Sequence, residues 1–113
     1  MVCVMKELLC RSEPPTAIFG AIDPFAMKAY IAAHECGLKI PQDLSVAGYA
    51  DFPFAQDLVP SLTTVRQDPY QMGRIAAKTM LDHILDRKGS EEPRRTHLAP
   101  MLIVRNSTGP VPG

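Results

Sequence analysis

Hydrophobic residues recur along the chain in short runs that switch between the period of a helix and that of a strand. The first eleven residues carry apolar side chains three and four positions apart, which predicts a helix near 3–11. The continuous apolar run at 16–20 is typical of a strand covered on both faces, as in a parallel sheet. The chain therefore alternates helix and strand from its first residues.

A second helix is predicted near 24–36. Asp23 is placed to cap it, Pro24 has the backbone angle of a first helical residue, and Gly37 supplies a left-handed terminator. Another apolar run follows at 44–49. Strand, helix and strand then form a βαβ unit with a right-handed crossover.

The clearest helix is predicted over 69–87. Asp68 precedes it as a cap, Gln71 lies three residues later as in a capping box, and Gly89 ends it. Its apolar residues fall at spacings of three and four, as expected of one helical face. They are Met72, Ile75, Ala76, Met80, Leu81, Ile84 and Leu85.

The remaining segments complete an α/β fold built of βαβ layers on a parallel sheet. Residues 51–60 have no sustained period and predict a loop with one helical turn. Strands are predicted at 62–66 and 101–105, and the proline-rich tail at 106–113 is expected to be poorly ordered.

Composition narrows the classes of protein. A chain of 113 residues with 46% hydrophobic and 21% charged residues has the size and balance of about one globular domain. Twelve basic residues cancel twelve acidic ones, so the chain lacks the positive field that holds nucleic acid. No signal peptide or membrane-spanning stretch is apparent, and we expect no membrane partner.

The three cysteines are Cys3, Cys10 and Cys36. Their odd number and their spacing support neither a disulfide framework nor a zinc site. This pattern favours a reducing, cytoplasmic compartment, and we expect no metal or cofactor.

The sequence predicts no enzyme. The segment at 20–23 lies between a strand and a helix, but it lacks the glycines and the lysine of a phosphate-binding loop. Ser45 and His34 belong to no hydrolase motif. Asp23 and Asp68 are each explained as helix caps in preference to ligand contacts.

Polar side chains follow the predicted strands at the edge where ligands of parallel α/β sheets bind. The carboxyl ends of three of these strands, at 20–23, 49–51 and 66–68, carry the polar residues Asp23, Tyr49, Asp51, Arg66 and Gln67. We expect them to form a site for a small polar ligand.

Two strings in the chain are specific: IPQDLSVAGY at 40–49 and PSLTTVRQD at 60–68. Together with shorter motifs, they resemble in order and spacing the C-terminal part of the lactose-repressor (LacI/GalR) family of bacterial transcription regulators. The shorter motifs lie at 15–19, 23, 26–27, 37–38, 72–73 and 105–108. The resemblance covers nearly the whole chain.

The resemblance implies a partial type I periplasmic-binding-protein-like fold. Residues 1–61 would belong to the second lobe, 62–68 to the crossover, 69–98 to a helix and turn of the first lobe, and 99–113 to a final strand and tail. The family's helix-turn-helix headpiece is absent from this sequence, so operator DNA would be reached only through a headpiece outside it.

The resemblance also places effector contacts. Ile22 and Ala50 stand where the family often has asparagine and aspartate for sugar hydroxyls, while Asp23, Asp51 and Gln67 match family positions. Buried hydroxyls without partners cost about 1–3 kcal/mol each, so we expect weak binding of simple sugars, at a site that also includes Arg66.

A homodimer is expected on two grounds. Met27 and Leu58 resemble interface residues of the family, and the apolar face of the helix at 69–87 needs a covering surface. We therefore expect the effector-sensing and dimerisation part of a regulator. The alternatives are the sugar-binding component of a transporter, a non-functional truncated remnant, or a small α/β enzyme.

Overall fold

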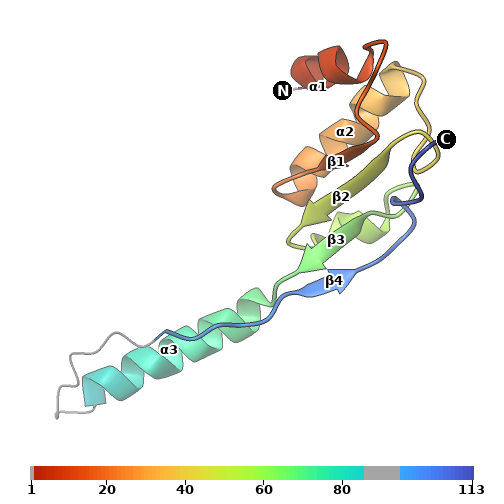
Figure 1. Cartoon of the computed structure of the whole chain (residues 1–113). Coiled ribbons are helices and arrows are strands. Elements are labelled where there is room, and N and C mark those ends of the chain that lie inside the picture. Colours follow the sequence, from red (N-terminus) through yellow and green to blue (C-terminus); the bar gives the residue numbers. More distant parts are fainter. Residues whose placement is uncertain (1, 86–94) are drawn as a thin grey trace. The chain divides into compact units, whose positions relative to one another are not determined.

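The computed structural model describes residues 2–85 and 95–113, which divide into two compact units (Figure 1). One unit comprises residues 1–66 and 101–113, and the other comprises 67–100. The described elements are, in chain order, α1 (Val2–Leu9), β1 (Ala17–Phe19), α2 (Asp23–Glu35), β2 (Ser45–Tyr49), the 3₁₀ turn η1 (Pro53–Gln56), β3 (Thr63–Arg66), α3 (Pro69–Leu85) and β4 (Met101–Ile103).

The larger unit is built on a four-stranded sheet in the order β1-β2-β3-β4. The first three strands are parallel, and β4 runs antiparallel to β3. This confirms the α/β class and the βαβ unit, and it adds one antiparallel strand to the expected parallel sheet. The predicted elements agree with the observed ones to within about two residues at every end that lies within the described residues.

The core lies between α2 and the sheet, with α1 packed on α2 (Figure 1). Four alanines of α2 are buried, and their small side chains let the helix approach the strands closely. Larger apolar residues complete the packing. The buried hydrophobic cluster is Leu9, Ala26, Ala29, Ala32, Ala33, Leu44, Val46, Ala55 and Leu62.

The cysteine prediction is wrong, because Cys10 and Cys36 form a disulfide. They are 26 residues apart in the sequence, and the packing of α1 on α2 brings their helix ends together. Spacing along the chain carries no information about such a contact. Cys3 is free and exposed.

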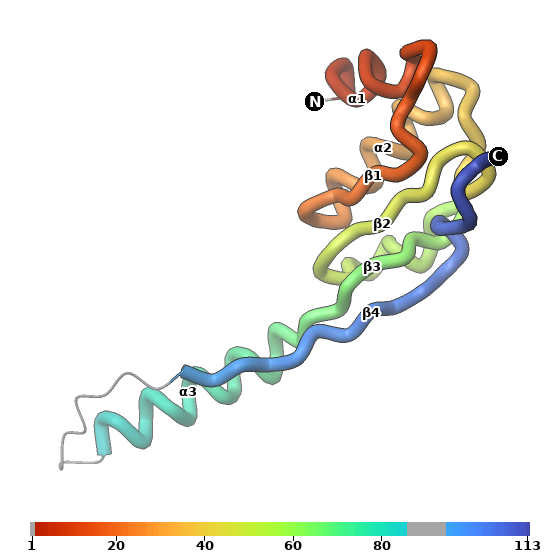
Figure 2. Tube along the Cα trace, in the orientation of Figure 1, coloured from red at the N-terminus to blue at the C-terminus, as the bar shows by residue number. Residues whose placement is uncertain are grey.

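The C-terminal tail is also ordered differently from the prediction. Ser107 is fully buried, and its hydroxyl accepts a hydrogen bond from the Thr63 backbone NH (2.8 Å) and donates one to the Val46 carbonyl (2.5 Å). Gly109 exchanges bonds with the Ser45 hydroxyl, so the tail returns beside the start of β2 (Figure 2). The polar groups of the tail form hydrogen bonds with the sheet, and these bonds hold the tail in place.

The smaller unit contains α3, whose start confirms the predicted cap. The Gln71 backbone NH donates to the Asp68 carboxylate at 2.9 Å. No residue of α3 is buried, and most of its predicted apolar stripe is exposed, including Ile84 at 62%. The predicted helix end at 86–87 and the predicted stop at Gly89 lie outside the described residues.

Candidate functional site

Asp23 does not cap the helix that it opens, so that prediction is wrong. Ile22 occupies the N-cap position, and no side chain caps the helix. The Asp23 carboxylate is instead buried at 0% exposure, where it accepts bonds from the Thr64 hydroxyl (2.6 Å) and the Phe52 backbone NH (2.7 Å). Gly48 makes room for this carboxylate, since a side chain there would collide with it. Asp23 thus links the segments that follow β1 and β2 to β3.

The chain leaves β2 through two residues with left-handed backbone angles. Ala50 has φ of 99° and Asp51 has φ of 54°, in a region that non-glycine residues seldom occupy. The Ala50 NH donates to the Val65 carbonyl at 2.8 Å, which holds this turn against β3. Such backbone geometry concentrates at functional sites, and here it directs Asp51 toward the end of β3.

Asp51 bridges two arginines at this edge of the sheet. One carboxylate oxygen accepts from Arg66 Nε at 2.6 Å, and the other accepts from a terminal guanidinium nitrogen of Arg105 at 2.8 Å. The Asp51 side chain is 6% exposed, and that of Arg66 is 52% exposed. The cluster therefore presents a guanidinium to solvent above a covered carboxylate.

The pKa of Asp51 reflects two opposed effects. Burial raises the pKa of its carboxyl, but the hydrogen bonds and positive charges of Arg105 and Arg66 outweigh burial, so the pKa lies below its ordinary value. Asp51 is ionised at neutral pH, and the three side chains together carry one positive charge.

Five of the six predicted ligand residues belong to the larger unit and follow its strands: Ile22, Asp23, Ala50, Asp51 and Arg66. Ile22 and Ala50 are half-buried. Gln67 follows directly in sequence and is the first residue of the smaller unit.

Arg105 is a member of the site cluster that the sequence reasoning missed. It lies 54 residues from Asp51, and its guanidinium also donates to the Leu62 carbonyl at 2.8 Å. The family-like motif at 105–108 includes Arg105, but nothing in the motif indicated an ion pair with Asp51.

The predicted interface residues lie in the larger unit. Met27 is on α2 with 36% exposure, and Leu58 is partly buried against the core. Their role stays a prediction.

A concave feature lies away from the Asp51 cluster, among α2 and the segments that precede β2 and β3. It is an open groove of about 430 Å³, and the Tyr30 hydroxyl spans part of it by donating to the Pro60 carbonyl at 2.8 Å. Its lining is Tyr30, His34, Leu38, Lys39, Ile40, Gln42, Val59 and Pro60.

Within residues 2–85 and 95–113, no group of three or more histidine, cysteine, aspartate or glutamate side chains could hold a metal ion. In the same part of the chain, no helix has the length and hydrophobicity needed to cross a membrane.

The fold of the chain matches that of known proteins. A model of the periplasmic binding protein-like domain matches residues 3–108. The chain belongs to this family. Within it, the chain corresponds to part of the effector-binding domain of LacI-type regulators, as the motifs at 40–49 and 60–68 indicated.

The relatives of this periplasmic binding protein-like chain are transcriptional regulators. It is 39% identical over 108 residues to the HTH-type transcriptional repressor PurR of Escherichia fergusonii, covering 96% of this chain and 31% of that protein. The chain thus spans about a third of the length of this curated relative.

Two solved structures share the fold. A LacI family regulator from Enterococcus faecium with bound ribose matches with a TM-score of 0.83 and 30% identity, over 97% of this chain and 40% of that one. A LacI family regulator from Lactobacillus casei with bound sucrose matches with a TM-score of 0.74 and 30% identity, over 95% and 39%.

Proposed function

We propose that this chain is the effector-sensing and dimerisation part of a LacI-type transcriptional regulator. The observation that carries the proposal is the match of 97% of the chain to a LacI family regulator with bound ribose. The 39% identity to a repressor supports the same function. In this proposal, a small molecule bound by the chain controls DNA binding by a headpiece outside the present sequence.

The proposed effector site is the edge of the sheet that carries the Asp51 cluster. Arg66 offers hydrogen-bond donors there, and Asp51 holds Arg66 in place at 2.6 Å. Gln67, the next residue in the sequence, is included in the proposed site because it matches a family position. Ile22 and Ala50 contribute apolar contacts in place of hydroxyl-binding groups. Asp23 has both carboxylate oxygens engaged inside the fold, so its contribution is to position the neighbouring strand ends.

The proposed partners follow from the same assignment. They are a small-molecule effector, a sugar or related metabolite; a second copy of the chain, contacted through Met27 and Leu58; and operator DNA through the headpiece. The regulator acts in the cytoplasm without a catalytic step, a cofactor or a membrane. Its formal charge of zero supports the absence of DNA contact by this chain itself.

A chimaeric repressor tests the proposal. Residues 3–108 replace the matching segment of the Escherichia fergusonii PurR protein, and operator binding is measured by gel shift and by a reporter gene. We expect the chimaera to bind the operator, because the segment supplies the same fold and dimer surface. A chimaera that is folded by circular dichroism yet fails to bind the operator contradicts the proposal.

The isolated chain is the control for this experiment. It should show no sequence-dependent binding of operator DNA at physiological salt, because it contains no headpiece and no basic surface field. Specific sub-micromolar binding by the isolated chain would show that this chain itself recognises DNA. It would contradict the proposal that only a headpiece outside the sequence does so.

A further inference from the structure

The ends of α1 and α2 carry a cysteine pair that has no part in the proposed effector site. We propose that Cys10 and Cys36 form a thiol–disulfide exchange site that reacts with low-molecular-weight disulfides such as oxidised glutathione. Oxidation of this site covalently joins α1 to α2. The proposal is independent of the regulatory function, since it rests on the two helices alone.

The two cysteines are held at bonding distance by the backbone of their own helices. Their Cα atoms are 5.6 Å apart, within the range of about 4.4–6.8 Å that a disulfide needs. The Cys10 backbone NH donates to the Lys6 carbonyl at 2.9 Å, and the Cys36 backbone NH donates to the Ala32 carbonyl at 3.0 Å. Each position is therefore set by a local helix-end bond.

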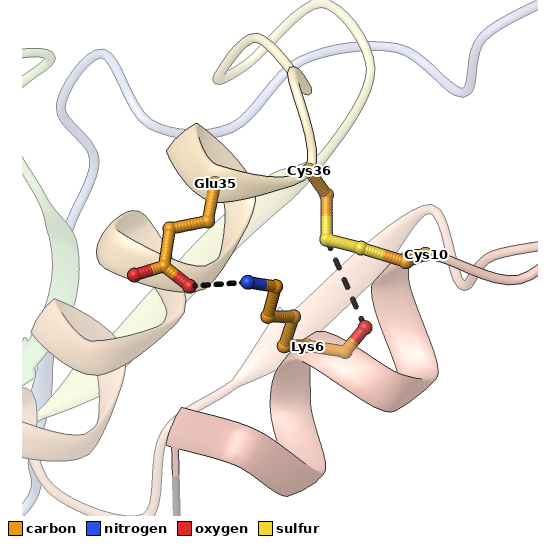
Figure 3. Close-up of a disulfide and its surroundings, with 4 residues drawn as sticks. All are labelled: Lys6, Cys10, Glu35 and Cys36. Carbon is orange, nitrogen blue, oxygen red and sulfur yellow. Dashed lines mark hydrogen bonds and ion pairs between the residues drawn. A yellow bond between two sulfur atoms is a disulfide. The ribbon is translucent and has the colours of Figure 1, made fainter.

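The same placement is supported by contacts that do not involve sulfur (Figure 3). The Lys6 ammonium lies 3.1 Å from the Glu35 carboxylate across the two helices, next to the cysteine pair. Leu9, one residue before Cys10, is buried in the core at 2% exposure. Neither contact depends on the disulfide bond, so we expect both thiols to stay close enough for reoxidation when the bond is reduced.

Cys36 has a partner ready for its reduced form. Its sulfur lies 3.7 Å from the Lys6 carbonyl oxygen (Figure 3). A disulfide sulfur carries no proton, whereas a thiol at that position can donate a weak hydrogen bond to the carbonyl. The site thus accommodates both redox states with little rearrangement.

The exposure of the two sulfur positions sets the order of reaction. Cys10 is exposed and Cys36 is partly buried, so a small reagent reaches Cys10 first. The Cys10 thiolate attacks one sulfur of oxidised glutathione, forming a mixed disulfide and releasing one glutathione thiolate. The Cys36 thiolate then attacks the Cys10 sulfur and releases the second glutathione. The cysteine pair loses two electrons and two protons, and two reduced glutathione molecules are formed.

Oxidation of the cysteine pair stabilises the docked position of α1. It has only eight residues, and an isolated helix of that length is marginal in water, so α1 depends on its contact with α2. The disulfide closes the 26-residue separation between the two positions and opposes undocking of α1.

The chain itself, without substitution, supplies the main test. The fully reduced chain is incubated with oxidised glutathione, treated with N-ethylmaleimide, and analysed by intact mass and peptide mapping. We expect a peptide linking Cys10 to Cys36, with Cys3 carrying either maleimide or glutathione, because this exposed thiol also exchanges with oxidised glutathione. Amide hydrogen exchange in α1 should be at least about tenfold slower in the oxidised than in the reduced chain. Three maleimide adducts, a persistent glutathione adduct on Cys10 or Cys36, or equal hydrogen exchange in the two states would overturn the proposal.

Two variants show that the pair is specific. Cys3→Ser is the matched control and should form the same link, with no maleimide adduct after oxidation. Cys10→Ser should leave Cys3 and Cys36 unlinked, each carrying maleimide or glutathione after the same treatment. A Cys3–Cys36 bond in that variant, or loss of the Cys10–Cys36 link in Cys3→Ser, would contradict a dedicated exchange site.

Discussion

The carboxylate of Asp23 accepts a 2.6 Å hydrogen bond from the hydroxyl of Thr64, and both side chains are fully buried. The other carboxylate oxygen accepts a hydrogen bond from the Phe52 backbone NH, so a single side chain links the segments that follow β1 and β2 to β3. This relationship makes Asp23 a structural residue at the edge of the proposed effector site.

The first prediction concerns this bond. Asp23→Ala leaves the buried Thr64 hydroxyl and the partly buried Phe52 NH without their partner, and it should lower the free energy of unfolding by about 2–5 kcal/mol. A double-mutant cycle with Thr64→Val, followed by urea denaturation, should give a coupling energy of about 1–3 kcal/mol. Additive losses would show that the two side chains do not stabilise each other.

The second prediction concerns the tail. Ser107→Ala removes a buried hydroxyl that satisfies the Thr63 NH and the Val46 carbonyl, and should destabilise the chain by about 1–3 kcal/mol. Ser12→Ala, at an exposed position, should stay within about 0.5 kcal/mol of the parent. Equal unfolding midpoints for both variants would mean that the tail contributes nothing to stability.

The third prediction is a pH dependence caused by Asp51. Its folded-state pKa is lowered, so the folded state holds this proton less tightly than the unfolded state does. The resulting stabilisation is fully present above the unfolded pKa of about 3.9 and is lost as the pH falls through the folded value.

Urea denaturation at several values between about pH 2 and 7 measures this loss. The parent should lose more stability than Asp51→Asn as the pH falls below about 4, because the variant has no carboxyl to protonate. Parallel pH profiles would assign the acid sensitivity to other groups.

The fourth prediction concerns the exposed apolar face of α3. Covering each of its larger side chains is worth about 1.5–3 kcal/mol, so we expect the chain to form a homodimer at micromolar concentration. Ile84→Asp should weaken the dimer in sedimentation equilibrium, whereas Lys78→Asp, which adds the same side chain at a polar position of the helix, should weaken it far less. A stable, well-folded monomer of the unsubstituted chain would contradict the prediction.

The fifth prediction concerns sugars. Because Ile22 and Ala50 offer no hydrogen bonds to hydroxyls, ribose and sucrose should bind weakly or not at all in calorimetry. Micromolar binding that disappears in Gln67→Ala would refute weak binding while supporting the location of the site.

Local patterns in the sequence were sufficient to predict most of the helices and strands. The capping box at Asp68 and the stripe that follows it specify α3, and the apolar run at 44–49 specifies β2, because both patterns depend on neighbouring residues. The positions of Asp51 and Arg66 after their strands were also predictable, since parallel strands end at one edge.

Interactions between distant residues were not predictable in this way. Asp23 has the local sequence pattern of a helix cap. Its carboxylate instead accepts a hydrogen bond from Thr64, which lies 41 residues away, and it does not cap the helix. Arg105 and Ser107 similarly find their partners across the sheet. A single sequence contains no record of these pairings, and residue type alone favours the local role.

The hydrogen bonds between Ser107 and Val46 also bear on how the chain folds during synthesis. The two residues are 61 positions apart, and β1, α2, β2 and β3 all emerge from the ribosome before Ser107 does. Until then the Val46 NH, which donates to the Ser107 carbonyl at 2.8 Å, lacks its final partner. The nascent sheet therefore stays open at the start of β2 until this late segment arrives, and its last bonds form as one of the final steps of folding.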